Sequence, residues 1–222
     1  MFKAIIVNKA EDDTIYANLS DVKDSQLPEE GDVTIAVHYS DVNFKDGLCL
    51  NGKGRLVREY PHIPGIDFSG TVAQGDGEEF KEGDRVILTG CRAGELFDGG
   101  YSQYAKVKKD HITKTPEGMT NKQAMILGTA GLTGLLCAFA VKAREELLMQ
   151  SKVNDVLVTG STGGVGMVAV MVLAKMGINV TAIITTVYAF FIFIINYNNS
   201  FSTINTLGHD TKYVKITKIS CA

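Results

Sequence analysis

The stretch Val156–Gly166 reads Val-Leu-Val-Thr-Gly-Ser-Thr-Gly-Gly-Val-Gly and leads directly into the apolar segment Met167–Lys175. A short β-rich run, a cluster of glycines and a helix-compatible run are typical of the first strand–turn–helix of a dinucleotide-binding fold. Glycine suits such a turn because a backbone without Cβ can bend sharply and lie close to a pyrophosphate, whose charge a helix N-terminus stabilises. The spacing, Gly160-x-x-Gly163-x-x-Gly166, departs from the strict G-x-G-x-x-G, so an ordinary tight strand–helix turn is the alternative.

The residues that follow this turn complete a strand–helix–strand unit. We expect a helix over Val165–Met176 and a second strand over Ile178–Ile183. The two strands should lie parallel and be joined by a right-handed crossover. Ahead of the turn, Thr120–Gln123 fits a capping box, which predicts that helices follow over Ala124–Leu127 and Gly131–Met149.

The first 120 residues show a different pattern. Short runs of alternating apolar and polar residues are separated by glycine turns, and no long helix is predicted. We expect strands at Lys3–Asn8, Thr14–Leu19, Val33–Tyr39, Phe68–Ala73, Arg85–Thr89 and Tyr101–Val107. Many short strands of this kind predict a compact, β-barrel-like first domain. The predicted fold class is therefore α/β with a β-rich first domain.

Composition narrows the classes of function. The chain has 222 residues and a formal net charge of -3, so it lacks the excess of positive charge that is typical of nucleic-acid-binding proteins. The N-terminus enters a strand pattern directly, and we expect no signal peptide and a cytoplasmic location. The cysteines are far apart and contain no C-x-x-C pair, which argues against a structural zinc lobe and a disulfide framework. They are Cys49, Cys91, Cys137 and Cys221.

Several stretches carry a resemblance to a known family. They are Ser40–Leu48 (Ser-Asp-Val-Asn-Phe-Lys-Asp-Gly-Leu), Asn51–Gly54 and Tyr60–Gly70 (Tyr-Pro-His-Ile-Pro-Gly-Ile-Asp-Phe-Ser-Gly), supported by Gly83–Gly90, Gly99–Gln103 and Gly128–Thr133. In order and spacing they resemble the zinc-free, quinone-oxidoreductase-like branch of the medium-chain dehydrogenase/reductase superfamily, most closely its NADPH-dependent acrylyl-CoA reductases. The resemblance covers about residues 1–183. It implies a GroES-like substrate domain at 1–120 and an incomplete Rossmann cofactor domain, a doubly wound parallel sheet, at 121–183.

The resemblance also implies roles for individual residues. The stretch that would face the nicotinamide and the substrate carbonyl supplies the candidate catalytic residues Asn43, Lys45 and Asp46. The candidate cofactor-binding residues are Gly47, Thr129, Thr162, Gly163, Gly164 and Val165. Read from the residues alone, Asn43 would cap a short helix and Thr129 would be a helix N-cap. Lys45 and Asp46 would likewise form a solvated surface pair.

Two positions separate this chain from its relatives. Zinc-using relatives carry Gly-His-Glu where this chain has Gly65-Ile66-Asp67, and Ile66 cannot bind a metal. No histidine lies within four residues of another histidine or of a cysteine, so we expect no metal site. Close relatives also usually carry tyrosine where Phe44 stands. This chain therefore has no phenol at that position that could donate a proton.

The family pattern ends after Ile183. Residues 177–209 contain no Lys, Arg, Asp or Glu, and neither a helical stripe nor a strand alternation persists. We expect residues 184–222 to be a non-family tail, disordered or aberrant, that comes from a frame error, a retained intron or alternative splicing. A transmembrane helix over Ile178–Ile195 is the alternative, although Asn and Thr residues dilute it.

The resemblance implies an enzyme that uses NADPH to reduce the C=C bond of a 2-enoyl thioester, acrylyl-CoA to propionyl-CoA. The alternatives are a quinone reductase of the same fold and a catalytically incompetent product truncated after about residue 183. Ile184-Thr185-Thr186 supplies neither an acid nor an arginine to read the adenosine ribose. The expected partners are a small-molecule enoyl-CoA or quinone and a second copy in a homodimer, with no nucleic acid and no membrane.

Overall fold

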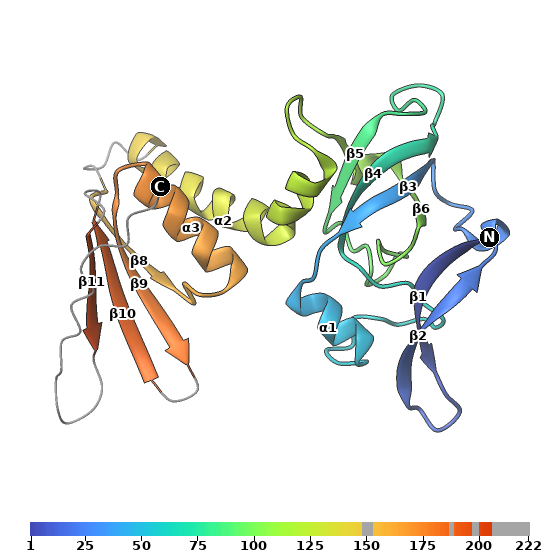
Figure 1. Cartoon of the computed structure of the whole chain (residues 1–222), viewed down its shortest axis with the longest axis horizontal. Helices are drawn as coiled ribbons and strands as arrows, with labels where there is room; N and C mark the ends of the chain where they lie inside the picture. Colours follow the sequence, from blue (N-terminus) through green and yellow to red (C-terminus); the bar gives the residue numbers. More distant parts are fainter. Residues whose placement is uncertain (148–152, 187–188, 197–199, 206–222) are drawn as a thin grey trace. The chain divides into compact units, whose positions relative to one another are not determined.

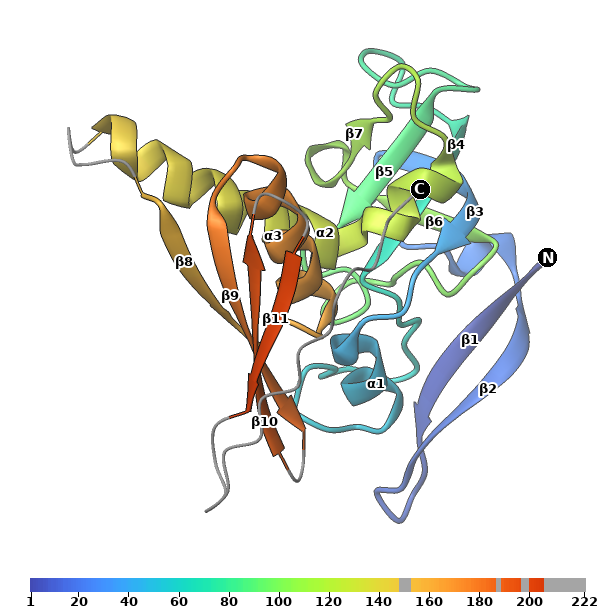
Figure 2. The ribbon, with the colours of Figure 1, turned by 60° about the vertical axis from the view of Figure 1, so that its left-hand side comes forward.

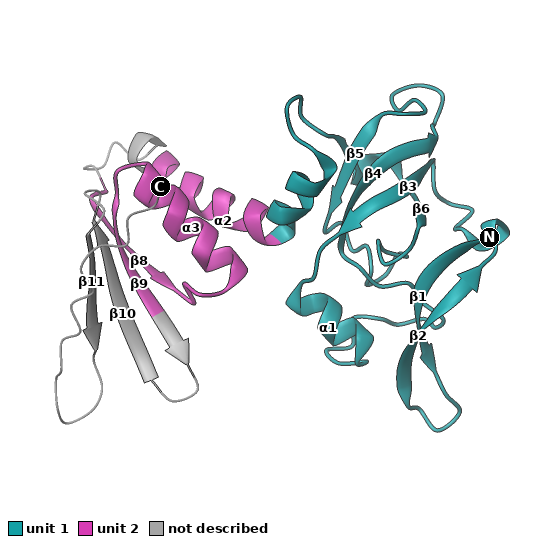
Figure 3. Cartoon of the chain, viewed as in Figure 1, with its two compact units in different colours: residues 1–129 teal, residues 130–222 magenta. Residues whose placement is uncertain are grey.

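The computed structural model of the chain describes residues 1–147, 153–186, 189–196 and 200–205. It divides into two compact units, Met1–Thr129 and Ala130–Ala222 (Figures 1 and 3). The boundary lies inside helix α2 (Asn121–Leu147), next to Gly128, whose φ of 51° and ψ of -160° interrupt the helix. We predicted the boundary after residue 120. The start of α2 instead belongs to unit 1, where Ser69 Oγ donates to the backbone oxygen of Asn121 at 2.8 Å.

Unit 1 is built on an antiparallel sheet with the strand order β6-β3-β4-β5-β7. Its strands are β3 (Val33–Ser40), β4 (Asp67–Gln74), β5 (Arg85–Thr89), β6 (Tyr104–Val107) and β7 (Thr113–Lys114). A separate antiparallel hairpin pairs β1 (Phe2–Lys9) with β2 (Ile15–Val22), which Figure 2 shows as a twisted ribbon. Short helical segments are α1 (Phe44–Leu50), η1 (Asp24–Gln26) and η2 (Lys109–His111).

The core of unit 1 follows from the period-two pattern of these strands. Val33 and Ile35 on β3, Phe68 on β4, and Val86 and Leu88 on β5 have no exposed surface and form one cluster. The intervening residues are partly or fully exposed on β3 and β5, as alternation predicts. This arrangement confirms the predicted β-rich first domain.

Unit 2 contains the predicted strand–helix–strand unit. β8 (Asp155–Thr159) and β9 (Asn179–Thr186) are parallel neighbours, and α3 (Gly164–Lys175) connects them. One side of α3 packs through Val170 and Leu173 on the sheet residue Val180, in a cluster that also includes Ala138 of α2. The incomplete Rossmann pattern predicted from the sequence is therefore confirmed.

The sheet of unit 2 continues in a way that the sequence did not predict. Its strand order is β11-β10-β9-β8, so β8 lies at an edge. β10 (Ala189–Asn196) and β11 (Ser200–Asn205) pair antiparallel to their neighbours. In the predicted tail, 184–222, these strands are extended and paired, whereas 187–188, 197–199 and 206–222 lie outside the described residues. The alternative helix over Ile178–Ile195 does not form, because β9 and β10 occupy its described residues.

One helix in the described ranges is long and apolar enough to cross a membrane by length and composition, the Asn121–Arg144 segment of α2. The core helix of a soluble protein passes the same test, and 33% of the most apolar window is buried here. Gly128 also interrupts the segment near its start.

Candidate functional site

The glycine-rich turn of unit 2 depends on two glycines for its shape. β8 ends at Thr159, and Gly160 follows with a φ of 61°, in the left-handed region that favours glycine. A Cβ on Gly166 would lie 2.3 Å from the backbone oxygen of Gly160, which no side chain tolerates. Gly163 then caps α3, and its oxygen accepts from the N–H of Met167 at 2.9 Å.

The four predicted cofactor-binding residues of unit 2 come together at the N-terminus of α3. Thr162, Gly163, Gly164 and Val165 are all exposed there. The first N–H groups of a helix lack intrahelical acceptors and carry the positive end of the helix dipole, so they attract an anion. A Cβ on Gly163 would have only one neighbour nearby, the Gly160 oxygen at 3.4 Å, so the solvent side of the turn is open.

Gly164 has a second, structural role. A Cβ at this position would lie 3.0 Å from the Cβ of Ala130, so the missing side chain lets α3 approach α2 closely. Ser161 ties the same turn to the sheet, because its hydroxyl donates to the oxygen of Ile183 at 2.9 Å. The turn is therefore held from both sides while its exposed rim faces solvent.

A buried carboxylate, Asp67, organises the candidate site of unit 1. Asp67 is 0% exposed. Thr129 donates to it twice, from its N–H at 2.6 Å and from its hydroxyl at 2.5 Å. The N–H of Gly90 and the Nδ2 of Asn43 each donate to it at 3.1 Å. Asp67 thus joins the start of α1, the end of β5 and the kink of α2 in one cluster.

These bonds define what Asn43 and Thr129 can offer a ligand. Asn43 is the N-cap residue of α1, as its local reading predicts, and its Nδ2 donates to Asp41 at 2.7 Å as well as to Asp67. Both amide hydrogens are therefore committed to carboxylates, which leaves the Asn43 side chain only as an acceptor. The Thr129 hydroxyl donates to Asp67, and a hydroxyl oxygen can accept a hydrogen bond as well as donate one.

Asp41 is the most strongly perturbed acid of this cluster. Burial, followed by the neighbouring Asp67 and Asp46, raises the pKa of Asp41 to about 7. Two carboxyl groups that share a site cannot both ionise cheaply, so the pair favours a state with one proton. Asp67 accepts four hydrogen bonds, so its carboxylate is well supplied with donors, whereas Asp41 is the acid of the cluster whose pKa is raised.

The remaining predicted residues of unit 1 have separate environments. Asp46 is fully buried rather than solvated, and its carboxylate accepts from the N–H of Asn43 at 2.8 Å and of Ile66 at 2.9 Å. Lys45 forms an ion pair at 2.8 Å with the buried Glu95. Gly47 is exposed, and a Cβ there would meet nothing within 4 Å. The reading of Lys45 and Asp46 as a surface pair is therefore wrong.

The structure offers no metal centre in the part of the chain that it describes. No group of three or more His, Cys, Asp or Glu side chains could hold an ion there. Ile66, at the position of the zinc-binding histidine in zinc-using relatives, is a core residue with 2% exposure. The cysteines at 49, 91 and 137 are free thiols.

Two residues of the cluster, Asp41 and Asp67, were absent from the predicted site. Asp67 had a signal, because it stands in the Gly65-Ile66-Asp67 segment where zinc-using relatives carry an acid. Asp41 had none, since a lone aspartate before an Asn-Phe-Lys run reads as a loop residue. Only the fold brings it against Asp67.

Comparison with known proteins places the chain in a family. Residues 29–117 match the alcohol dehydrogenase GroES-like domain. An acrylyl-CoA reductase of Ruegeria pomeroyi is 48% identical over 184 residues, which are 82% of this chain and 54% of that protein. This chain belongs to the medium-chain dehydrogenase/reductase family. It spans about half the length of the curated relatives that it matches.

Further relatives include a quinone oxidoreductase and two oxidoreductases crystallised with a nicotinamide dinucleotide. A quinone oxidoreductase of Sus scrofa is 32% identical over 160 residues, which are 69% of this chain and 44% of that protein. A Salmonella enterica oxidoreductase crystallised with NADP is 41% identical, with a TM-score of 0.75 over 81% of this chain and 54% of that one. A Bacillus subtilis family member crystallised with NAD is 42% identical, with a TM-score of 0.73 over 82% and 54%.

The Asp41–Asp67 pair predicts how stability depends on pH. Because the folded pKa of Asp41 is raised to about 7 from an ordinary 3.8, the folded chain holds a proton that the unfolded chain has lost between these values. Unfolding free energy should therefore fall as the pH rises through this window. Asp41→Asn keeps a neutral hydrogen-bonding group and has no carboxyl group to titrate, so its unfolding free energy should rise relative to that of the parent between about pH 4 and pH 7.

Urea unfolding across this pH range, followed by circular dichroism, measures the difference. Asp110→Asn is the matched control, because Asp110 is an exposed residue of η2 and its replacement should follow the parent at every pH. A constant difference between Asp41→Asn and the parent would show that Asp41 holds no such proton.

Proposed function

We propose that this family member binds NADPH and reduces the C=C bond of a 2-enoyl thioester such as acrylyl-CoA. The 48% identity to an acrylyl-CoA reductase supports an enoyl thioester as the class of substrate. The open glycine turn at the N-terminus of α3 supports the cofactor, since two solved relatives contain NADP or NADPH. In this proposal Thr162, Gly163, Gly164 and Val165 hold the pyrophosphate through the helix N-terminus.

Unit 1 supplies the groups for the nicotinamide and the acyl thioester. When bound, NADPH would supply a hydride to the β-carbon of the enoyl group, and negative charge would develop on the thioester oxygen. The Thr129 oxygen would accept from the carboxamide of the nicotinamide, and Asp67 would fix its orientation. Gly47, without a side chain and exposed, leaves room for the ligand beside α1.

The groups of the cluster also limit how a proton is delivered to the α-carbon. Phe44 has no ionisable group, and it is 86% exposed. Burial and the nearby Asp46 raise the pKa of Tyr101, whose hydroxyl donates to the backbone oxygen of Asp41 at 3.1 Å. A phenol with a raised pKa is a poorer acid. Asp41, with a pKa near the working pH, is the better proton source of the two.

One observation favours a second candidate, a chain without activity. β8 lies at the edge of its sheet, and Leu157 on it is 59% exposed. In the doubly wound order of a complete cofactor domain, the first strand is central and pairs on both sides. An uncovered first strand would leave the cofactor site without part of its support.

A turnover assay separates the candidates. We expect NADPH oxidation with acrylyl-CoA to exceed oxidation with a small quinone under the same conditions. We also expect the turnover rate with NADH to lie within about tenfold of the rate with NADPH. The reason is that residues 177–209 contain no Lys or Arg side chain that could bind the 2′-phosphate of NADPH. Faster reduction of the quinone would favour the quinone reductase, and no turnover with bound NADPH would favour the inactive chain.

The cofactor turn predicts the effect of Gly163→Val. Gly163 has a φ of -76°, which any residue adopts, and its side is open, so the variant should fold. A β-branched side chain there would stand in the path of the phosphate and should weaken NADPH binding by at least roughly tenfold, on the order of 1.4 kcal/mol. Titration followed by NADPH fluorescence measures the dissociation constant of the variant and of the parent.

Thr162→Ala is the matched control, because it removes one exposed hydroxyl of the same turn and keeps the backbone N–H groups. This substitution should weaken the free energy of NADPH binding by about 1 kcal/mol or less. Gly164→Val is a poorer test, since its side chain would also collide with Ala130. Equal affinity of Gly163→Val and the parent would mean that the phosphate does not bind at this turn.

A further inference from the structure

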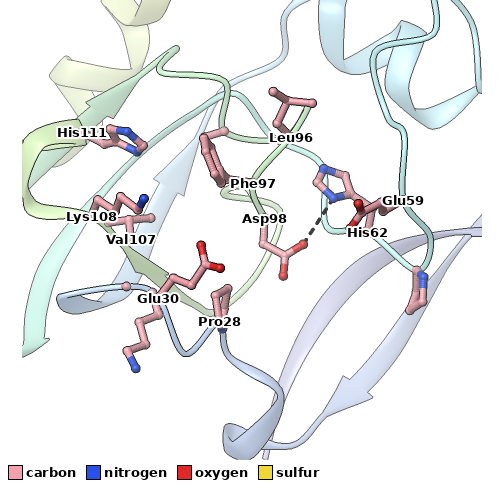
Figure 4. A pocket seen from close by; sticks show the side chains of 14 residues that line it. Pro28, Glu30, Glu59, His62, Leu96, Phe97, Asp98, Val107, Lys108 and His111 are labelled. Carbon is pink, nitrogen blue, oxygen red and sulfur yellow. Dashed lines mark ion pairs between the residues drawn. The ribbon is translucent and has the colours of Figure 1, made fainter.

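The segment Asn51–Tyr60, which follows α1, is positively charged in a chain that is negative overall. The whole chain has a formal net charge of -3, whereas this segment contains Lys53, Arg55 and Arg58 against one acid, Glu59. The three basic side chains are exposed. Glu59 lines a separate cavity (Figure 4). Basic side chains that gather in one short segment attract an anion to it.

Two of these residues, Arg55 and Arg58, lie in the wall of one pocket of unit 1. The volume of this pocket is about 450 Å³. Its wall also contains Lys9 and Asp13, which form an ion pair with each other at 2.6 Å, so their charges cancel. The positive charge of the pocket therefore comes from the two arginines.

Arg55 and Arg58 differ from the other arginines of unit 1 in their partners. Arg85 donates to a backbone oxygen, and the Nε of Arg92 lies 3.2 Å from the buried Glu95. Arg55 and Arg58 form neither a hydrogen bond nor an ion pair with any residue that the structure describes. A guanidinium group has five N–H donors in a rigid fork that matches the oxygens of a phosphate. The donors of both side chains are thus available to a ligand.

The backbone holds this segment in place. The N–H groups of Gly52 and Lys53 donate to carbonyl oxygens of α1 at 3.2 Å and 2.8 Å, and a Cβ on Gly52 would lie 2.4 Å from Ile15 of β2. Arg55 has a φ of 51°, in the left-handed region that is uncommon for a residue with a side chain. Such a conformation costs free energy, and it points to a function for the side chain that occupies it.

The position of the pocket suits an acyl-CoA. This class of molecule has its thioester at one end, its phosphate groups at the other and a long pantetheine arm between them. Asn43, at the N-terminal end of α1, bonds to Asp67, whereas Gly52 of the pocket follows the C-terminal end. A helix of this length is about 10 Å long. The thioester and the phosphates would therefore bind at opposite ends of α1.

We propose that the pocket of Arg55 and Arg58 binds the phosphate groups of the coenzyme A part of the substrate. The two guanidinium groups would donate to phosphate oxygens in charge-assisted hydrogen bonds, which are stronger than neutral ones. Ile15 and Tyr60, also in the wall, would lie beside the adenine. This inference rests on the proposed function, since it takes an enoyl-CoA as the substrate.

Calorimetric titration of the full chain with coenzyme A tests the site without turnover. The parent should bind coenzyme A saturably, and it should bind pantetheine, which lacks the phosphates, at least about tenfold more weakly. Arg58 is exposed and has no partner among the described residues, so Arg58→Gln should fold. It should weaken the binding of coenzyme A by at least about tenfold. No saturable binding to the parent, or equal affinity of the variant and the parent, would overturn the proposal.

Lys53→Gln is the matched control for the charge. It removes one exposed positive charge from the same segment, but Lys53 does not line the pocket. Its effect is therefore limited to a screened interaction through solvent, and it should change the affinity for coenzyme A by less than about twofold. Equal losses in Arg58→Gln and Lys53→Gln would show a general charge effect and would contradict the site.

Titration with NADPH distinguishes the two ligands that carry phosphates. Arg58→Gln should bind NADPH with the affinity of the parent, because the turn proposed for the cofactor belongs to unit 2. An equal loss for NADPH would assign the arginines to the cofactor and overturn the proposal. A chain that binds coenzyme A through Arg58 but does not reduce acrylyl-CoA would support this site and contradict the proposed function.

Discussion

The candidate site of unit 1 depends on a single buried carboxylate. Asp67 accepts hydrogen bonds from Thr129, Gly90 and Asn43, residues that come from segments far apart in the chain. A buried charge without such donors would be very costly, so the fold must supply all of them together. The left-handed Gly128 belongs to the same arrangement, because a Cβ on it would lie 1.9 Å from Asp41 Oδ2 and 2.9 Å from Asp67 Oδ2.

This constraint explains how the candidate site keeps its shape. Where zinc-using relatives have a metal to organise their ligands, this chain has a hydrogen-bonded cluster around Asp67. Asn43 commits both of its amide hydrogens to the carboxylates of Asp41 and Asp67, and so links the two acids. The cluster is therefore sensitive to the protonation of Asp41, whose pKa is raised to about 7.

The cofactor turn of unit 2 rests on a different constraint, the absence of side chains. Gly160 and Gly166 approach each other too closely for any Cβ, and Gly164 lets α3 pack on α2. The sequence predicted this turn and its helix correctly, because close backbone approach and positive φ leave a glycine pattern in the sequence. The resemblance in turn predicted the family, which the comparisons confirm.

The sequence could not predict what depends on distant partners. Asp46 looked like a surface residue because nothing in its neighbourhood shows that Ile66 will bring its N–H to that carboxylate. The link between Asp41 and Asp67 is invisible for the same reason. The order of β10 and β11 was also missed, since an apolar run without alternation does not tell a strand from a buried helix.

We propose that the N-terminus of α3 receives the pyrophosphate of NADPH. Backbone amide NMR of the ¹⁵N-labelled chain tests it most directly, because it reports on each N–H group separately. At saturating NADPH, the amide signals of Thr162, Gly163, Gly164 and Val165 should shift more than those of the rest of α3. Unchanged signals at these four residues, with NADPH demonstrably bound, would contradict the account.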